Sequence, residues 1–353
     1  MSKTAAYRAP RRLRIIVLMH EDLVPPATLV GFSDEEIAAW KTEFDVVSCL
    51  EDIGHDVRPL GVHADLQIIR DTIDDFKPHI IFNLLEEFHG VAAYNYSVVS
   101  YLELLRQPYT GCNPRGLLLA RDKALSKKVL SYHRIPTPGF AVFPVGRKIH
   151  RPARLQFPLL VKSLIEEASL GIAQASIVYS DEKLSERVRF IHEHVGTDAL
   201  VEHYIDGREF YVGVLGNTRL KTLPVWELHF DSLPEGAPRI ATEKVKWNYA
   251  YQKKIGLRTQ AVEDVDSESV KAIERLCKRT YRTLNLSGYA RMDLRMDADG
   301  NVFVLEANPN PQLSFGEDFA ESASHAGMSY ESLLQRILSI GLSYRPLWQV
   351  RGE

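Results

Sequence analysis

The chain has 353 residues, 45% of them apolar, and a formal net charge of −3. This length allows two or three domains with a sizeable core. A charge so close to zero provides no general basic field, so nucleic acid is not an expected partner and any anionic ligand must be met by local positive groups. The apolar runs are too short for a membrane-spanning helix, and we expect no membrane partner.

The cysteines indicate a reducing compartment. Cys49, Cys112 and Cys277 lie far apart and form no CxxC motif. That pattern is typical neither of a disulfide framework nor of a zinc site. The apolar stretch at residues 15–19 is too short for the core of a secretion signal. We therefore expect a cytoplasmic protein.

The first third of the chain alternates strand-like and helix-like stretches. Strands are predicted at residues 13–19 and 79–84, and helices at 34–50 and 94–105. Such alternation favours a parallel sheet with right-handed crossovers. No GxGxxG follows the first strand, so the fingerprint of a dinucleotide site is missing. Because ligands of such sheets bind beyond the carboxyl ends of the strands, Glu21 is a candidate for the rim of a pocket.

The middle of the chain begins with a helical stretch at residues 117–133. Pro136 and Pro138 stop it, because proline cannot continue a helix. Three strands and one helix follow, at residues 157–162, 175–179, 199–204 and 185–194. We place domain boundaries near residues 113 and 205, which gives domains at residues 1–113, 114–205 and 206–353.

The last part contains a long stretch without clear periodicity. A strand is predicted at residues 209–215, and the polar, aromatic-rich stretch 234–256 follows it. An aperiodic loop of this length usually carries function or is disordered. Helices are predicted at residues 267–284 and 330–341.

Residues 288–311 predict a two-stranded hairpin. Asp299-Gly300 is a strong signal for a type I′ turn, in which both central residues need a positive φ. With those residues at the tip, Asp293 faces Glu306 and Arg291 faces Asn308. Pairs two residues apart in a strand point to the same face, so all four side chains should lie together.

The facing carboxylates of Asp293 and Glu306 should repel by roughly a few tenths to one kcal/mol, so we expect a cation between them. Oxygen ligands without a nearby thiolate or imidazole favour Mg²⁺ over zinc. The alternative is a solvated hairpin with scattered charges, but the apolar residues of the second strand argue for burial. A three-residue loop would shift the register by one and separate the pairs.

Further polar residues suggest an anion site, though each has an ordinary explanation. Lys162 is followed by a loop with small residues, including Ser169 and Gly171, whose backbone N–H groups can approach a phosphate. The loop lacks the P-loop pattern, and alone it is better explained as an ordinary hairpin loop. Lys123, at the start of the helix after the first boundary, has the same ambiguity. Glu202 and Glu209 flank a strand–turn–strand and could accept hydrogen bonds from a nucleotide.

The order of these features resembles the ATP-grasp superfamily, and within it the D-alanine–D-alanine ligase branch. The resemblance runs from about residue 80 to residue 330. It rests on seven short matches: PYTG at 108–111, RDK at 121–123, IPTP at 135–138, VK at 161–162, SLGI at 169–172, VEHYIDGRE at 201–209, and RMD with EANPNP at 291–311. It implies an N-terminal parallel α/β domain, a small central α+β domain and a C-terminal α+β domain with an antiparallel sheet.

The resemblance implies ATP and Mg²⁺ as cofactors, with ATP held between the central and C-terminal domains. The implied nucleotide contacts are Lys123, Lys162, Ser169, Gly171, Glu202, Tyr204, Ile205 and Glu209. The implied ligands of two Mg²⁺ ions, or of Mn²⁺, are Asp293, Glu306 and Asn308. Three residues have implied catalytic roles: Arg291 against the charge of the intermediate, Lys246 on a mobile lid loop, and Glu21 beside the first substrate.

The substrate positions depart from the family. Ala168 stands where the family has serine, and Trp247 where it has tyrosine. Gln312 replaces a glycine, and Glu317 lies near a serine that contacts the second D-alanine. A buried site that loses its polar partners rejects its former substrate strongly. We therefore expect the pocket to accept something other than two D-alanines.

The expected activity is that of an ATP-dependent ligase. It would join amino acids or small peptides through an acyl phosphate, forming ADP and phosphate, and the resemblance implies a homodimer built on the N-terminal domain. One alternative is a true D-alanine–D-alanine ligase. Another is an ATP-binding regulator without catalysis. The presence of Arg291 argues against a regulator, because a binding module does not need an arginine that stabilises an oxyanion.

Overall fold

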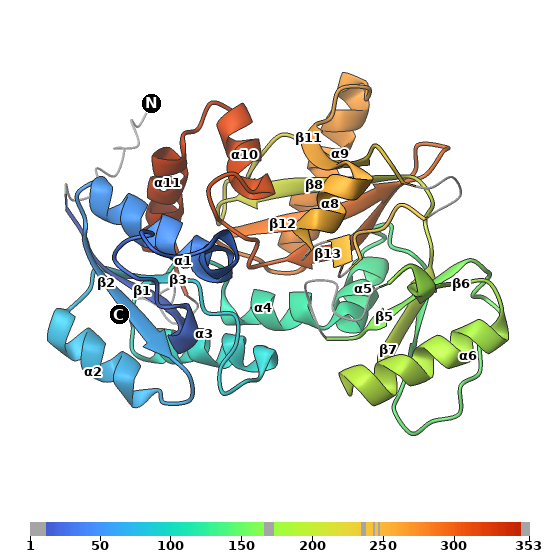
Figure 1. The fold of residues 1–353 in the computed structure, drawn as a ribbon, viewed down its shortest axis with the longest axis horizontal. Helices are drawn as coiled ribbons and strands as arrows, with labels where there is room; N and C mark the ends of the chain where they lie inside the picture. Colours follow the sequence, from blue (N-terminus) through green and yellow to red (C-terminus); the bar gives the residue numbers. More distant parts are fainter. Residues whose placement is uncertain (1–11, 166–172, 234–237, 243, 246–247, 347–353) are drawn as a thin grey trace.

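The computed structural model describes residues 12–165, 173–233, 238–242, 244–245 and 248–346 (Figure 1). The first sheet has the order β2-β1-β3 and is parallel, as predicted. Its strands are β1 (Arg14–His20), β2 (Asp56–Val62) and β3 (Ile80–Asn83). The helices that accompany it are α1 (Asp34–Asp52), α2 (Gln67–Phe76) and α3 (Asn95–Leu104). The strand and helix expected around residues 13–19 and 34–50 are thus present.

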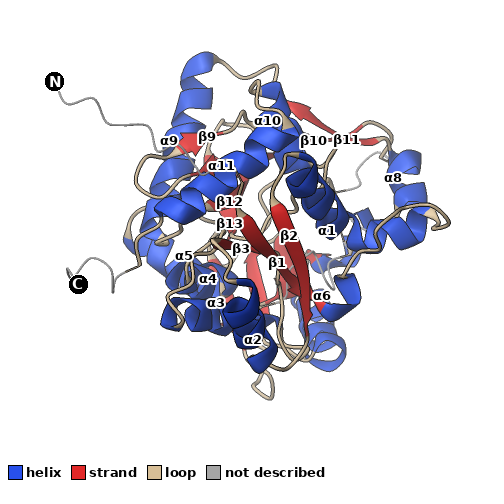
Figure 2. Ribbon diagram, turned by 90° about the vertical axis from the view of Figure 1, so that its left-hand side faces the viewer, coloured by secondary structure: helices blue, strands red, loops and turns tan. Residues whose placement is uncertain are grey.

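The first sheet is covered on both faces, which explains its apolar strands. Ile16 and Leu18 point to one face, into a core shared with α2 and α3. Ile15 and Val17 point to the other, where α1 and α11 (Tyr330–Ser343) pack. Helix α11, the last helix in the described part of the chain, therefore lies against the first sheet, beside α1 (Figure 2).

The central sheet is antiparallel, with the order β4-β7-β5-β6. Its strands are β4 (Phe140–Phe143), β5 (Leu159–Ser163), β6 (Ile177–Val178) and β7 (Ala199–His203). Helix α6 (Asp181–Phe190) packs on it through Leu184 and Val188. The predicted strands of this region are confirmed. Short turns of 3₁₀ or π helix lie at Ala92–Tyr94, Gln174–Ser176 and Ile191–Val195.

The C-terminal sheet has the order β11-β10-β8-β12-β13, with β9 beside β8. Its strands are β8 (Arg208–Leu215), β9 (Lys221–Thr222), β10 (Trp226–Phe230), β11 (Leu257–Ala261), β12 (Tyr289–Met296) and β13 (Val302–Asn308). The helices of this region are α8 (Tyr249–Ile255), α9 (Ser267–Thr283) and α10 (Asp318–His325). The stretch predicted to be aperiodic therefore contains a helix, α8, which Asn248 caps by accepting from the Tyr251 N–H. No helix in the described ranges is long and apolar enough to cross a bilayer.

The helix predicted at residues 117–133 is two helices, α4 (Pro114–Arg121) and α5 (Lys123–Tyr132). Asp122 separates them with an extended ψ of 99°. Its side chain accepts a hydrogen bond from the Leu125 N–H at 2.8 Å, as an N-cap does. The periodicity continues across this break, so the pattern alone did not show it.

The hairpin pairs Asp293 with Glu306 and Arg291 with Asn308, as predicted. The predicted turn, however, is wrong. The loop has three residues, 298–300, and only Gly300 among them has a positive φ, at 82°. A one-residue bulge at Leu305 then shifts the register back. The two offsets cancel, which is why the pairing is right.

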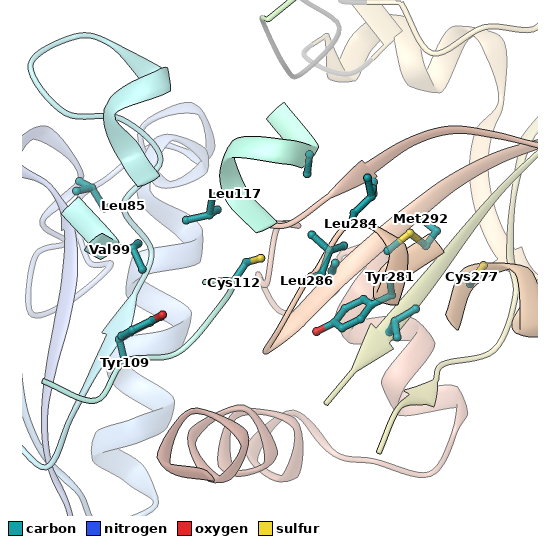
Figure 3. Close-up of a cluster of buried hydrophobic side chains, with 14 of the residues drawn as sticks. Leu85, Val99, Tyr109, Cys112, Leu117, Cys277, Tyr281, Leu284, Leu286 and Met292 are labelled. Atoms are coloured by element: carbon teal, nitrogen blue, oxygen red, sulfur yellow. The ribbon is translucent and has the colours of Figure 1, made fainter. Parts of the chain in front are cut away.

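One apolar core joins the first sheet to the C-terminal sheet. Cys112 and Leu117 lie between Val99 on one side and Leu286 and Tyr281 on the other (Figure 3). Since this core is continuous across the predicted boundary at residue 113, the two parts are packed together. The domain boundaries themselves remain predictions.

Gly288 is required where these two parts meet. It has a φ of +72°, and a side chain there would collide with the backbone of Gly111. This close approach holds the start of β12 against the segment that follows the first sheet. It explains why the PYTG match, which ends at Gly111, matters for the fold.

Glu43 is a buried acid on α1, only 5% exposed. Burial raises the pKa of Glu43 from 4.5 to about 7, so its ionisation destabilises the fold as the pH rises through that range. We compare the free energies of unfolding of Glu43→Gln and the wild type. We predict that the difference favours the variant more at about pH 8 than at about pH 4.5, by roughly 1–3 kcal/mol. Urea unfolding at both pH values measures this. Glu51→Gln, exposed on the same helix, is the control, and a pH-independent difference for Glu43→Gln would contradict the prediction.

Candidate active site

One face of β12 carries a stripe of charged side chains. Arg291, Asp293 and Arg295 alternate along the strand and therefore point to the same face. Across the sheet, β8 places Tyr211 opposite Asp293 and Glu209 opposite Arg295. The stripe thus runs from the candidate catalytic arginine toward the candidate ribose contact.

Arg291 and Asp293 form a tight pair. Arg291 Nε donates to Asp293 Oδ1 at 2.7 Å, and Nη2 donates to Oδ2 at 2.8 Å. The guanidinium also lies 4.6 Å from the centre of the Tyr211 ring. Burial opposes the charge of Arg291, but Asp293 outweighs it and raises the pKa of the guanidinium. Arg291 is therefore a fixed positive charge beside the hairpin carboxylates.

The hairpin presents an oxygen-only donor set. Asp293 and Glu306 face each other, and Asn308 follows two residues beyond Glu306, with its Oδ1 accepting from the Asn310 N–H at 2.8 Å. Within the ranges described above, no three His, Cys, Asp or Glu side chains gather as a metal site would need. Mg²⁺ usually takes one or two carboxylates and completes its shell with water and substrate phosphates. Two carboxylates and an amide oxygen fit that habit.

The central sheet contributes a buried triad of charges. Glu202 on β7 is 1% exposed and binds two lysines, Lys162 on β5 through Oε1 at 2.7 Å and Lys127 on α5 through Oε2 at 2.9 Å. Burial alone would raise the pKa of Glu202, but the two ammonium groups together hold it below its usual range. The resemblance implies that Glu202 contacts the adenine of ATP, and that role stays a prediction. In the structure the carboxylate is the counterion of two lysines.

Lys162 links this triad to the hairpin. Burial disfavours its charge, but Glu202, Glu306 and Asp293 act against that effect and raise its pKa. The hairpin lies beside the central part of the chain, because the Val304 N–H of β13 donates to the Pro136 carbonyl, shortly before β4, at 2.9 Å. The structure thus brings together the lysine and the acidic residues that the sequence predicted to share a site.

Lys127 was missed by the sequence reasoning. It lies one helical turn after Lys123 on α5, and both are buried. Like charges four residues apart on a helix repel, so two lysines at that spacing predict a nearby anion. That signal was present in the sequence, but only the structure identifies the partner as the buried carboxylate of Glu202.

The far end of the stripe is held by Arg295, which the sequence reasoning also missed. Its Nη2 donates to Glu209 Oε2 at 2.8 Å, and its Nη1 donates to the Ile205 carbonyl at 2.7 Å. Tyr211 donates to the other oxygen of Glu209 at 2.8 Å. The guanidinium lies 5.2 Å from the centre of the Tyr204 ring. Arg295 therefore ties together the three residues expected to contact adenine and ribose.

A polar cavity of about 310 Å³ opens beside Glu209. Its walls come from the start of β8 and from β10, including Glu227 and His229, and from Arg239. This volume is at the lower end of the range for small-molecule sites. Glu209 thus borders both the charged stripe and a space large enough for a small ligand.

Several predicted site residues are not placed in this arrangement. Ser169, Gly171 and Lys246 lie outside the described residues, as do Ala168 and Trp247.

Glu21 is exposed in a short 3₁₀ turn (Glu21–Leu23) at the end of β1. It lies against Gly61 of β2, the edge strand. In the ranges described above, its side chain makes no hydrogen bond or ion pair with the hairpin. The catalytic role expected for Glu21 stays a prediction that this placement does not support.

Comparison with known proteins shows the same family throughout. The family model described as "D-ala D-ala ligase C-terminus" matches residues 131–339. The chain is 32% identical to the uncharacterized protein y4sG of Sinorhizobium fredii, covering 84% of this chain and 85% of that protein. It is 29% identical to the D-alanine–D-alanine ligase of Desulforudis audaxviator, covering 88% and 95%.

The fold is that of the same enzymes. The crystal structure of D-alanine–D-alanine ligase from Bacillus anthracis complexed with ATP superposes with a TM-score of 0.72 at 23% identity. The match covers 94% of this chain and 97% of that one. This likeness confirms the predicted ATP-grasp architecture.

The buried triad makes a prediction about stability. Glu202→Gln leaves two buried ammonium groups without their carboxylate, and we expect it to lower the free energy of unfolding by about 3–5 kcal/mol. Urea unfolding near neutral pH measures the effect. The control is Glu186→Gln, which removes an exposed carboxylate paired with Lys183 and should leave the unfolding midpoint nearly unchanged. Equal midpoints for the two variants would show that the triad contributes no stability.

Proposed function

The chain belongs to the D-alanine–D-alanine ligase branch of the ATP-grasp superfamily, and we propose that it joins an amino acid or small peptide to a second amine through an acyl phosphate. It is an ATP-dependent carbon–nitrogen ligase that forms ADP and phosphate. The observation that carries the proposal is the Arg291–Asp293 pair, which faces Glu306 across the hairpin.

The first half-reaction would be phosphoryl transfer. A substrate carboxylate attacks the γ-phosphate of ATP, the bond to the β-phosphate oxygen breaks, and an acyl phosphate and ADP result. Lys162 offers positive charge to the phosphates. So does Lys123, which lies on α5 four residues before Lys127, a member of the triad. Asp293, Glu306 and Asn308 would hold Mg²⁺, which when bound offsets the negative charge of the phosphates.

The second half-reaction would be amine attack. The nitrogen of the acceptor bonds to the acyl carbon, the carbonyl oxygen takes up negative charge, and phosphate leaves as the amide forms. Arg291 is fixed by Asp293 and only partly exposed, so its guanidinium is preorganised to stabilise that oxygen. Loss of such a donor typically costs about 3–4 kcal/mol of transition-state stabilisation. No protein nucleophile is needed.

The substrates are the finer part of the proposal. Gln312 stands where the family has a glycine, and Glu317 lies near the serine that contacts the second D-alanine, which supports an altered pocket. The second candidate is a true D-alanine–D-alanine ligase, favoured by relatives that bear this name, such as the Bordetella petrii protein at 33% identity over 71% of this chain and 73% of that protein.

An ADP-release assay with pooled amino acids tests the activity. We expect pooled L- and D-amino acids to raise ADP formation above the rate with ATP and Mg²⁺ alone, because the acyl phosphate forms only with a carboxylate. Mass spectrometry of the products then separates the two candidates, since D-alanine alone should suffice for a D-alanine–D-alanine ligase. No rise with any pool of amino acids or dipeptides would contradict a ligase.

Asp293→Asn tests the hairpin. We predict loss of turnover by at least about a hundredfold and weaker binding of Mg²⁺-ATP, because the variant removes a metal-binding charge and the partner of Arg291. Steady-state kinetics and calorimetric titration with Mg²⁺-ATP measure the two effects. The control is Asp299→Asn, the same substitution in the exposed loop of the hairpin, which should leave both unchanged. An active Asp293→Asn would remove the hairpin from the mechanism.

A further inference from the structure

The segment that follows the metal hairpin brings a carboxylate toward Arg291. It runs from the end of β13 to Glu317, which immediately precedes α10. In the family, a serine near this position contacts the second substrate. Replacing a small hydroxyl by a carboxylate adds a negative charge, so the location of Glu317 decides what the acceptor site can bind.

Helix α1 of the first domain anchors this segment. Lys41 Nζ donates to the Phe315 carbonyl at 2.6 Å, and the Phe315 N–H donates to Asp45 Oδ2 at 2.9 Å. The hydroxyls of Thr42 and Ser314 lie 2.6 Å apart. These contacts fix the backbone two residues before Glu317. Its position is therefore built into the fold rather than left to a free loop.

The first turn of α10 packs beside Arg291. The Phe319 ring lies 2.9 Å from the position that a Cβ on Gly213 would occupy, so the ring packs directly over that glycine. Gly213 is the cross-strand partner of Arg291. Phe319 also contacts Tyr289, on the same face of β12, with ring centres 5.9 Å apart. Glu317, two residues before Phe319, is thereby placed at the acceptor end of the stripe.

The carboxylate of Glu317 is not used by the fold. It does not cap α10, and in the described part of the chain it makes no hydrogen bond or ion pair. Burial, with Asp318 adding to it, raises its pKa, while Lys41 and Arg291 act in the opposite direction. Glu317 therefore lies within the influence of two cations but is bound to neither, which leaves it available to a substrate.

We propose that Glu317 selects the acceptor. Glu317 favours acceptors in which a neutral amide replaces the α-carboxylate, as in an amino acid amide or at the N-terminus of a peptide. It disfavours an amino acid whose α-carboxylate is free. The carboxylate attracts the acceptor's ammonium group and repels a second carboxylate. This inference rests on the proposed function, since it concerns the second half-reaction of the ligase.

A competition experiment tests the proposal on the wild-type protein. ATP, Mg²⁺ and pooled amino acids are supplied with equimolar alaninamide and isotopically labelled alanine, each as a racemate. The ratio of the two products by mass spectrometry gives the ratio of their kcat/KM values. We expect alaninamide products to exceed labelled alanine products by tenfold or more.

Two variants assign the preference to Glu317. Glu317→Gln keeps the shape and removes the charge, so the product ratio should fall toward one. Glu317→Ser restores the family's residue and should reverse the preference toward alanine. Both should change the KM of the acceptor while leaving the KM of ATP within about twofold, which a general structural defect would not do. Glu331→Gln, an exposed carboxylate in the first turn of α11, is the matched control and should keep the wild-type ratio.

The outcomes separate the two levels of the argument. Equal use of alanine and alaninamide by the wild type, or a product ratio that Glu317→Gln leaves unchanged, overturns the role of Glu317 while the ligase activity stands. Absence of ADP release with every combination overturns the proposed ligase and this inference with it. The wild-type ratio needs no variant, so a poorly folding Glu317→Ser does not block the test.

Discussion

The site depends on a balance of buried charge between two sheets. Its six central groups carry three positive and three negative charges: Lys127, Lys162, Arg291, Glu202, Asp293 and Glu306. Four of these groups, Lys127, Lys162, Glu202 and Asp293, are buried. Removing one partner of a buried ion pair is strongly destabilising, so this neutrality favours the packing of the lysine side against the hairpin side. A triphosphate entering a neutral site adds several negative charges at once. The site therefore needs further cations when the nucleotide binds, which is the physical reason to expect divalent metal at the hairpin.

Much of the fold could be read from the sequence because its elements are strongly patterned. The buried strand β1 and the parallel first sheet follow from apolar runs between helical stretches. The hairpin pairing of Asp293 with Glu306 was predicted correctly, but for an incomplete reason. The turn at Asp299-Gly300 has another geometry, and the bulge at Leu305 compensates for it. A bulge leaves no clear trace in a single sequence, because it changes the count of residues and not their type.

The missed site residues are those whose role depends on a distant partner. Arg295 follows the Arg291–Asp293 alternation, yet nothing in the sequence pairs it with Glu209, 86 residues earlier. Lys127 gave a local signal through its spacing from Lys123. Neither helical periodicity nor turn chemistry specifies which side chains meet between two sheets, so these contacts required the three-dimensional structure.

The packing of α11 against the first sheet has a consequence for synthesis in the cell. Leu333, Leu334 and Ile337 complete the apolar layer that covers Ile15 and Val17. During translation those strand residues emerge more than 300 positions ahead of the helix that shields them. Until residues 333–337 have left the ribosome, Ile15 and Val17 lack part of their apolar cover, so the first sheet can complete its core only after α11 has been made.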